Sequence, residues 1–183
     1  MRLSILICTM PSRSEMLKKL TQQLMLLLAK YDESQWEVLI QPDENINVGR
    51  KRNILLQKAS GDFVVFIDDD DEIHDNYIDA FMNAIESNPD ADCIGYRGYI
   101  TFDGTSRKDW VISKECETWH EKDGVYYRTP NHISPVKRKI ALKVMFPQIE
   151  FGEDYEYSMG ILPLLKNEVF IDEQLYHYKF MAK

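Results

Sequence analysis

The sequence predicts an α/β fold with a mostly parallel, doubly wound sheet and a smaller mixed or antiparallel C-terminal part. Up to residue 90, apolar β-rich runs alternate with segments of helical periodicity, an order typical of parallel sheets with right-handed crossovers. After Pro89, two strand-like segments flank an Asp103-Gly104 turn, which indicates a hairpin. The 183 residues suffice for one domain, expected over residues 1–183.

The first half of the chain is expected to hold three strands and three helices. Apolar runs predict strands at residues 3–8, 36–40 and 63–67. Leucines at helical spacing predict a helix over residues 12–30, with a capping box formed by Ser12 and Glu15. The other two helices are expected over residues 47–59, before Gly61, and 75–87, before Pro89.

The second half of the chain is expected to combine strands and helices without the regular alternation of the first half. The expected elements, in order, are strands at 92–102 and 107–113, a strand within 118–128, a short basic helix over 135–144, an acidic turn at 150–154, a helix over 155–166 interrupted near Pro163, and a last strand at 169–171.

Composition excludes some classes of protein. A net charge of −8 argues against a nucleic-acid or anionic-membrane binder. No apolar run approaches the roughly 20 residues of a membrane span, so no transmembrane segment is expected. The three cysteines are widely spaced and odd in number, which indicates a reducing compartment and hence a cytoplasmic location. The sequence gives no indication of oligomeric state.

Four consecutive aspartates, Asp68 to Asp71, follow the run 63–67, which is typical of a strand buried on both faces. In an extended backbone alternate side chains share a face, so Asp68 and Asp70 would point together. Mg²⁺ and Mn²⁺ bind such oxygen pairs and complete their coordination with phosphate and water. An acidic surface loop is the alternative. The position at the end of a core strand, where open α/β sheets bind ligands, favours a metal site.

Four segments together resemble the family 2-like glycosyltransferases of the GT-A fold. They are residues 9–13 (TMPSR), 47–53 (NVGRKRN), 59–71 (ASGDFVVFIDDDD) and 152–155 (GEDY). The resemblance implies a nucleotide-binding half over 1–90 and an acceptor-binding half over 91–183. It also implies a metal-dependent, inverting hexosyltransferase that moves a sugar from a nucleotide-diphosphate donor, expected to be a UDP-sugar, to a hydroxyl of a carbohydrate or other acceptor.

The resemblance makes Asp70 the main ligand of Mn²⁺ or Mg²⁺ and makes Asp68 either a contact of the donor ribose or a water-mediated partner. The register within the run is uncertain by one residue, so Asp69 and Asp71 remain candidates. For Asp71 the alternative is capping of the next helix.

The resemblance also assigns a set of donor-binding residues, which are Thr9, Pro11, Arg13, Asp43, Asn47, Arg52, Asp68 and Asp69. Asp43 would read the uracil edge, and its alternative is a turn residue after Pro42. Arg52 would lie near the base and the diphosphate, and its alternative is a surface arginine.

Asp154 matches the acid that takes the acceptor proton in inverting members of this family. Its alternative is a helix N-cap, and Glu153 is the alternative base. His177 would add a metal ligand and favour Mn²⁺. Its alternative is a packed histidine among tyrosines.

Acceptor recognition is expected from residues 95–113, 119–127 and 130–132, because tyrosine and tryptophan offer flat faces to sugars. Three other functions stay open. A haloacid dehalogenase-like phosphatase would have its aspartates after the first strand and a Thr or Val where Glu72 stands. A nucleotidyltransferase would have a glycine-rich loop in place of residues 9–13. A non-catalytic nucleotide-sugar binding module would bind without turnover.

Overall fold

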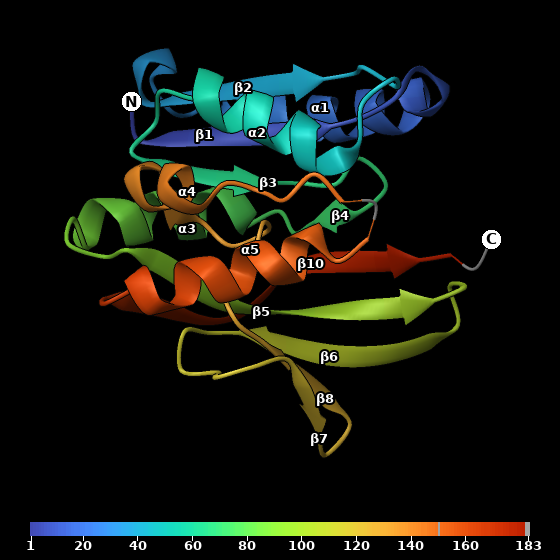
Figure 1. Ribbon diagram of the computed structural model, residues 1–183. Helices are drawn as coiled ribbons and strands as arrows, with labels where there is room; N and C mark the ends of the chain where they lie inside the picture. The colour runs from blue at the N-terminus through green and yellow to red at the C-terminus, as the bar shows by residue number, and fades with distance from the viewer. Residues whose placement is uncertain (150, 182–183) are drawn as a thin grey trace.

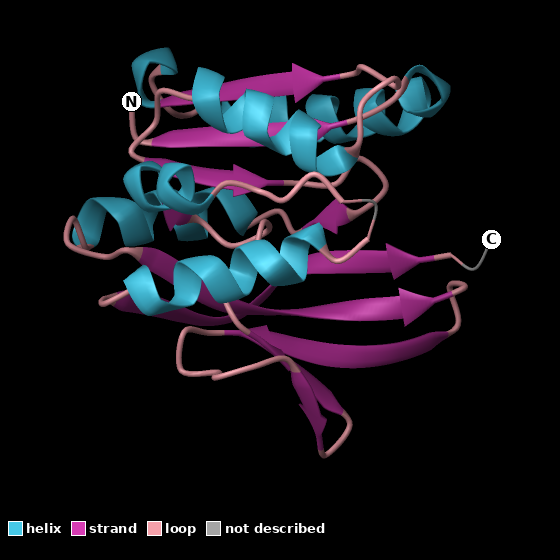
Figure 2. Cartoon of the chain, in the orientation of Figure 1, coloured by secondary structure: helices cyan, strands magenta, loops and turns pink. Residues whose placement is uncertain are grey.

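The computed structural model describes residues 1–149 and 151–181. One continuous sheet runs through the molecule, and helices cover both of its faces (Figures 1 and 2). Helices α2, α4 and α5 lie over one face, and α1 and α3 lie over the other. This layered arrangement confirms the predicted α/β, doubly wound fold. Glu150, part of the predicted acidic turn, lies outside the described residues.

The N-terminal half follows the predicted order of elements. Strand β1 (Leu3–Cys8) lies between β2 (Trp36–Gln41) and β3 (Phe63–Phe66) and is parallel to both. The helices of this half are α1 (Ser14–Leu28), α2 (Val48–Lys58) and α3 (Tyr77–Ser87). All six elements end within about two residues of their predicted limits.

The predicted capping box at the start of α1 is wrong. Pro11–Arg13 form a short 3-10 helix, η1, so Ser12 lies inside η1. The N-cap of α1 is Arg13, and no side chain caps the helix there. Pro11, whose φ angle suits a first helical turn, explains why η1 forms ahead of α1.

Burial of β1 and β3 on both faces creates two core layers. Leu3, Ile5 and Ile7 belong to the layer with α1 and α3, whereas Leu6 belongs to the layer with α2, α4 and α5. All four residues of β3 are buried. This confirms the interpretation of the run before the aspartates as a core strand.

The C-terminal half extends the sheet. The helices and strands not yet named are β4 (Glu72–Ile73), β5 (Cys93–Phe102), β6 (Ser106–Ile112), β7 (His120–Lys122), β8 (Val125–Arg128), β9 (Val136–Lys137), α4 (Arg138–Val144), α5 (Glu153–Ile161) and β10 (Glu168–Phe180). Strands β5 and β6 form the predicted antiparallel hairpin. The 3-10 helix η3 (Leu162–Leu164) follows α5, which is the interruption predicted at Pro163. The region 118–128, where one strand was expected, holds two strands, β7 and β8.

The last strand is much longer than the predicted 169–171. Strand β10 runs parallel to β5 along nearly its whole length and also pairs with β4. Two register shifts, between Ile171 and Gln174 and between Gln174 and Tyr176, break its side-chain alternation. The regular pattern that would reveal such a strand is therefore absent from the sequence. Strands β4 and β9 are too short to produce any pattern.

Within residues 1–149 and 151–181, no helix has the combination of length and apolar character that a membrane span requires.

The hairpin packing gives a test of the fold. Gly98 of β5 lies directly opposite Trp110 of β6, and a Cβ atom at Gly98 would lie 2.1 Å from the indole ring. Because overpacking forces such side chains out of place, Gly98→Ala should lower the free energy of unfolding by about 1–3 kcal/mol in urea titrations. Ser106→Ala, on the exposed start of β6, is the matched control and should leave stability unchanged. Equal stability of both variants would contradict the packing of Trp110.

Candidate functional site

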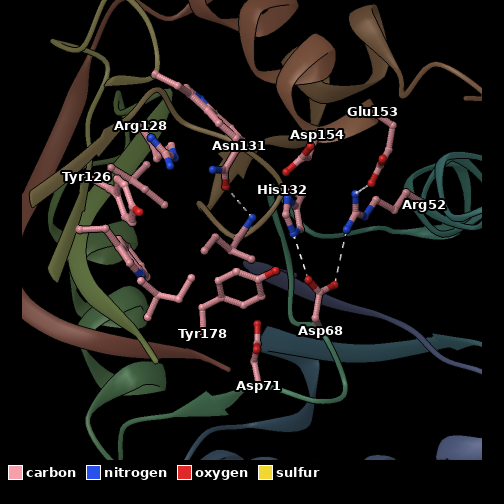
Figure 3. Close-up of a pocket in the computed structure, with 15 residues that line it drawn as sticks. Arg52, Asp68, Asp71, Tyr126, Arg128, Asn131, His132, Glu153, Asp154 and Tyr178 are labelled. Carbon is pink, nitrogen blue, oxygen red and sulfur yellow. Dashed lines mark hydrogen bonds and ion pairs between the residues drawn. The ribbon is translucent and has the colours of Figure 1, made fainter. Parts of the chain in front are cut away.

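A pocket of about 370 Å³ lies where β3 ends (Figure 3). One side is formed by Asp68 and Asp71, which follow β3, and by Arg52 of α2. Glu153 and Asp154, at the start of α5, line a second side. Aromatic residues of the C-terminal strands line the remainder, so both halves of the chain contribute to the pocket.

Asp69 is buried behind this edge of the sheet. Its carboxylate accepts hydrogen bonds from Thr9 Oγ1 at 2.5 Å and from Arg13 Nη1 at 2.8 Å. Arg13 Nη1 also lies 3.0 Å from Asp70 Oδ2. Two predicted donor residues, Thr9 and Arg13, are therefore brought to the aspartate run from the loop after β1.

Asp70 is the most exposed of these carboxylates, with 36% of its side chain accessible. Burial and the neighbouring Asp68 charge raise the pKa of Asp70, although Arg13 opposes this. A further cation beside Asp70 would stabilise its charged form.

Asp71 links the aspartate run to the last strand. It accepts hydrogen bonds from the Tyr176 hydroxyl at 2.8 Å and the Lys179 backbone amide at 2.9 Å. Burial, with the charge of Asp68, raises the pKa of Asp71 well above its usual value. The N-cap of α3 is Asn76, so the alternative in which Asp71 caps that helix is wrong.

Asp68 is held between two cationic or potentially cationic side chains. Its Oδ2 lies 3.2 Å from His132 Nε2, and its Oδ1 lies 3.4 Å from Arg52 Nη2 (Figure 3). Burial opposes ionisation of Asp68, but His132 and Arg52 outweigh it and lower the pKa of this carboxyl. Asp68 is therefore charged at neutral pH.

Arg52 is not a surface residue, because only 5% of its side chain is exposed. Its Nη1 donates to Glu153 Oε1 at 2.5 Å, and its guanidinium lies over the rings of Phe66 and Phe146. Arg52 thereby ties α2 to the end of β3 and to the start of α5. The alternative of an exposed helix arginine is wrong, and contact of Arg52 with a donor stays a prediction.

Asp154 occupies the first turn of α5 and points into the pocket (Figure 3). Its Oδ1 accepts a hydrogen bond from the backbone amide of Tyr155 at 2.8 Å. The N-cap of α5 is Gly152, with φ 84°, so the alternative that Asp154 is the N-cap is wrong. The neighbouring Glu153 is buried and engaged by Arg52.

Three predicted site residues have other local roles in this structure. Asp43 is exposed and accepts hydrogen bonds from Asn45, as a turn residue does. Asn47 caps α2 through the amide of Arg50. Pro11 is exposed in η1. Their donor contacts stay predictions.

His177 is not among the residues that line the pocket. Its ring nitrogens lie 2.8 Å from Thr101 Oγ1 and 3.2 Å from Glu72 Oε2, and its ring stacks on Tyr99. Its neighbour Tyr178 lines the pocket instead, because successive side chains of a strand point to opposite faces. The metal role of His177 stays a prediction.

Two basic pocket residues were assigned no individual role from the sequence. His132 contacts Asp68 from the loop after β8, and Arg128 ends β8. The loop 130–132 was expected to serve the acceptor, but nothing in the sequence linked its histidine to an aspartate 64 residues away.

The carboxylates fit a divalent-cation site that is completed by substrate phosphate and water. Across residues 1–149 and 151–181, no group of three or more His, Cys, Asp or Glu side chains is arranged to hold a metal ion. Mg²⁺ and Mn²⁺ sites completed by substrate phosphate and water need only one or two carboxylates. Asp70, accessible and crowded by Asp68, fits that requirement.

Comparison with protein families settles the membership of this chain. The family model described as Glycosyl transferase family 2 matches residues 14–146. The chain belongs to glycosyl transferase family 2. Membership argues against the phosphatase and nucleotidyltransferase alternatives. An uncharacterized glycosyltransferase from Haemophilus influenzae is 26% identical over 123 residues, which are 67% of this chain and 48% of that protein.

Solved structures of TarS from S. aureus share the GT-A fold of this family 2 chain. The structure of TarS 1-349 in complex with UDP has a TM-score of 0.74 at 17% identity, over 98% of this chain and 60% of that chain. The complex with UDP-GlcNAc has a TM-score of 0.73 at 14% identity, over 100% of this chain and 60% of that chain. The family 2 chain thus spans about half of the curated relative and 60% of these TarS chains.

The Arg52–Glu153 pair generates a stability prediction. Arg52→Met leaves Glu153 buried and unpaired. Breaking a buried ion pair in this way should lower the free energy of unfolding by about 3–5 kcal/mol. Urea unfolding of Arg52→Met, Glu153→Leu and the double variant measures this cost, and the double variant should recover a large part of it. Arg2→Met removes an exposed pair with Glu86 and should change stability far less. An Arg52→Met variant as stable as Arg2→Met would contradict a structural role for the pair.

Proposed function

We propose that this chain transfers a sugar from a nucleotide-diphosphate donor, most simply a UDP-sugar, to a hydroxyl group of an acceptor. The observation that carries the proposal is a single pocket in which the Asp154 carboxylate lies across from the strand-end aspartates (Figure 3). Membership of glycosyl transferase family 2 supports it. The UDP and UDP-GlcNAc complexes of TarS support the choice of uridine.

The donor would lie at the ends of β1 and β3. Thr9 and Arg13 come from the loop after β1, and both already contact the aspartate run. In the proposal the diphosphate lies beside Asp70 and Arg13, and the sugar extends into the pocket towards Asp154. Asp43 would contact the uracil and Asp68 the ribose.

Asp70 would hold a divalent cation, Mn²⁺ or Mg²⁺, together with oxygens of the diphosphate. A cation at that position neutralises charge on the leaving diphosphate without a proton. Arg13 adds a fixed positive charge on the same side.

Asp154 would act as the general base. The acceptor oxygen forms a bond to the anomeric carbon while its proton passes to Asp154. The bond from that carbon to the diphosphate breaks, and the diphosphate leaves with the electron pair. Because attack and departure occur on opposite faces of the sugar, this arrangement inverts the anomeric configuration. Glu153 suits this role less, since Arg52 already engages its carboxylate.

Donor binding is the first test of the proposal. UDP should bind in the presence of Mn²⁺, and its affinity should fall by about 10-fold or more in EDTA and in Asp70→Asn, since one charge-assisted contact is lost. Isothermal titration calorimetry with UDP, GDP and ADP measures this. Asp90→Asn, exposed on the loop after α3, is the matched control. Equal affinity in Mn²⁺ and in EDTA would refute the metal role, whereas a preference for GDP would correct only the base.

Asp154→Asn should separate chemistry from donor binding. The amide keeps the size of the carboxylate and an oxygen for the Tyr155 amide, but it is a far weaker base. Turnover should fall by about 10²- to 10⁴-fold, with little change in UDP affinity. Release of UDP from UDP-sugars in the presence of a panel of sugar acceptors measures turnover.

Glu156→Gln is the matched control, because it makes the same chemical change in the first turn of α5 on an exposed side chain. It should retain the turnover of the parent protein. Near-normal turnover of the Asp154→Asn variant would exclude Asp154 as the general base. UDP binding without turnover in the parent protein would favour a non-catalytic binding module.

A further inference from the structure

The pocket contains two arginines in very different electrostatic situations. Arg52 is paired with Glu153 and Asp68. Arg128, at the end of β8, lies on the aromatic side of the pocket across from Asp154 (Figure 3). Within residues 1–149 and 151–181, no carboxylate lies within salt-bridge distance of Arg128. Its one side-chain hydrogen bond in that part of the chain runs to the backbone oxygen of Tyr127, at 3.2 Å.

Two aromatic rings fix the position of Arg128. Its guanidinium carbon lies 4.8 Å from the ring centroid of Trp119 and 4.8 Å from that of Tyr126. Trp119 is held in turn by the Thr129 hydroxyl, at 2.9 Å, and packs edge-on against Tyr155. Contacts with ring faces leave the N–H groups at the edge of a guanidinium free to bind a planar or tetrahedral oxyanion.

The surroundings do not neutralise Arg128 directly. Glu121, the acid of the neighbouring strand β7, forms its ion pair with Lys108 and acts on Arg128 only through longer-range attraction. Asp154 acts on Arg128 only through longer-range attraction, and burial lowers the pKa of Arg128. A half-buried cation with an unfilled fork of donors is stabilised when an anionic ligand supplies the missing acceptors.

We propose that Arg128 selects an acceptor that carries an anionic oxygen group, a carboxylate or a phosphate, close to the hydroxyl that is glycosylated. The inference rests on the proposed function for the identity of this side of the pocket as the acceptor side. In this arrangement the anion lies against Arg128, the sugar ring packs on the aromatic wall, and the reacting hydroxyl faces Asp154. Arg128 binds the substrate and takes no part in bond making.

The test uses sugars that differ at one carbon. Glucuronate, glucose 6-phosphate and glucose are titrated into the protein by saturation-transfer NMR, with and without UDP. At least one anionic sugar should bind about 10-fold or more tightly than glucose, the gain expected for a charge-assisted hydrogen bond. Comparison of glucuronate with glucose 6-phosphate identifies which anion is preferred.

Arg128→Gln should abolish the preference for the anionic sugar and leave glucose binding and UDP affinity unchanged. The matched control is Arg97→Gln, which removes an arginine paired with Asp172 and lying outside the pocket. The control should keep the preference, and melting temperatures check that both variants are folded.

Three results would overturn the inference. The first is equal binding of charged and neutral sugars, and the second is no binding of any anionic sugar. The third is a loss of UDP affinity in Arg128→Gln as large as its loss of affinity for the anionic sugar, which would assign the guanidinium to the donor diphosphate. Failure of the parent protein to bind UDP would refute the proposed function instead, and the titrations without UDP would still report the preference for an anion.

Discussion

Four adjacent carboxylates at the end of a buried strand repel one another, and the structure depends on how each is compensated. Asp68 is held by Arg52 and His132, and Asp69 by Thr9 and Arg13. Asp71 binds β10 through Tyr176 and Lys179. Asp70 shares Arg13 and remains partly open to solvent. Charge that is costly to bury is thus distributed over separate partners.

The same contacts assemble the pocket. The partners of the aspartate run come from four parts of the chain, so α2, β10 and the loops after β1 and β8 all converge on the end of β3. The buried Arg52–Glu153 pair then fixes the start of α5, on which the neighbouring Asp154 is carried. An exposed Asp70 and an Asp154 aimed into the pocket are therefore two consequences of one electrostatic arrangement.

The N-terminal half was predictable because β1 and β3 are buried on both faces and α1 and α3 carry regular apolar stripes. The same patterns predicted where β1 and β3 end. Those ends place Thr9, Arg13 and the aspartate run at one edge of the sheet. Strand β10 was largely missed because bulges around Gln174 interrupt its alternation. The partners of Arg52 and Asp71 could not be predicted, since Glu153 and Tyr176 lie more than 100 residues away from them and no local pattern records such pairs.

Asp154 was assigned from resemblance, and the sequence alone also allowed a helix cap. Glycine at position 152, with its positive φ angle, takes that place and leaves Asp154 directed into the pocket. His132 and Arg128 carry no sequence signal, because a single histidine in a loop or an arginine beside aromatic residues is common in packed cores.

A crystal structure of the chain with Mn²⁺ and an intact UDP-sugar tests the central claim most directly. The account predicts the diphosphate beside Asp70 and Arg13, with the anomeric carbon in the pocket facing Asp154. A donor bound elsewhere would contradict it, for example in the basic pocket at the other end of β3 that is lined by Arg2, Lys137 and Lys139. An anomeric carbon directed away from Asp154 would contradict it equally.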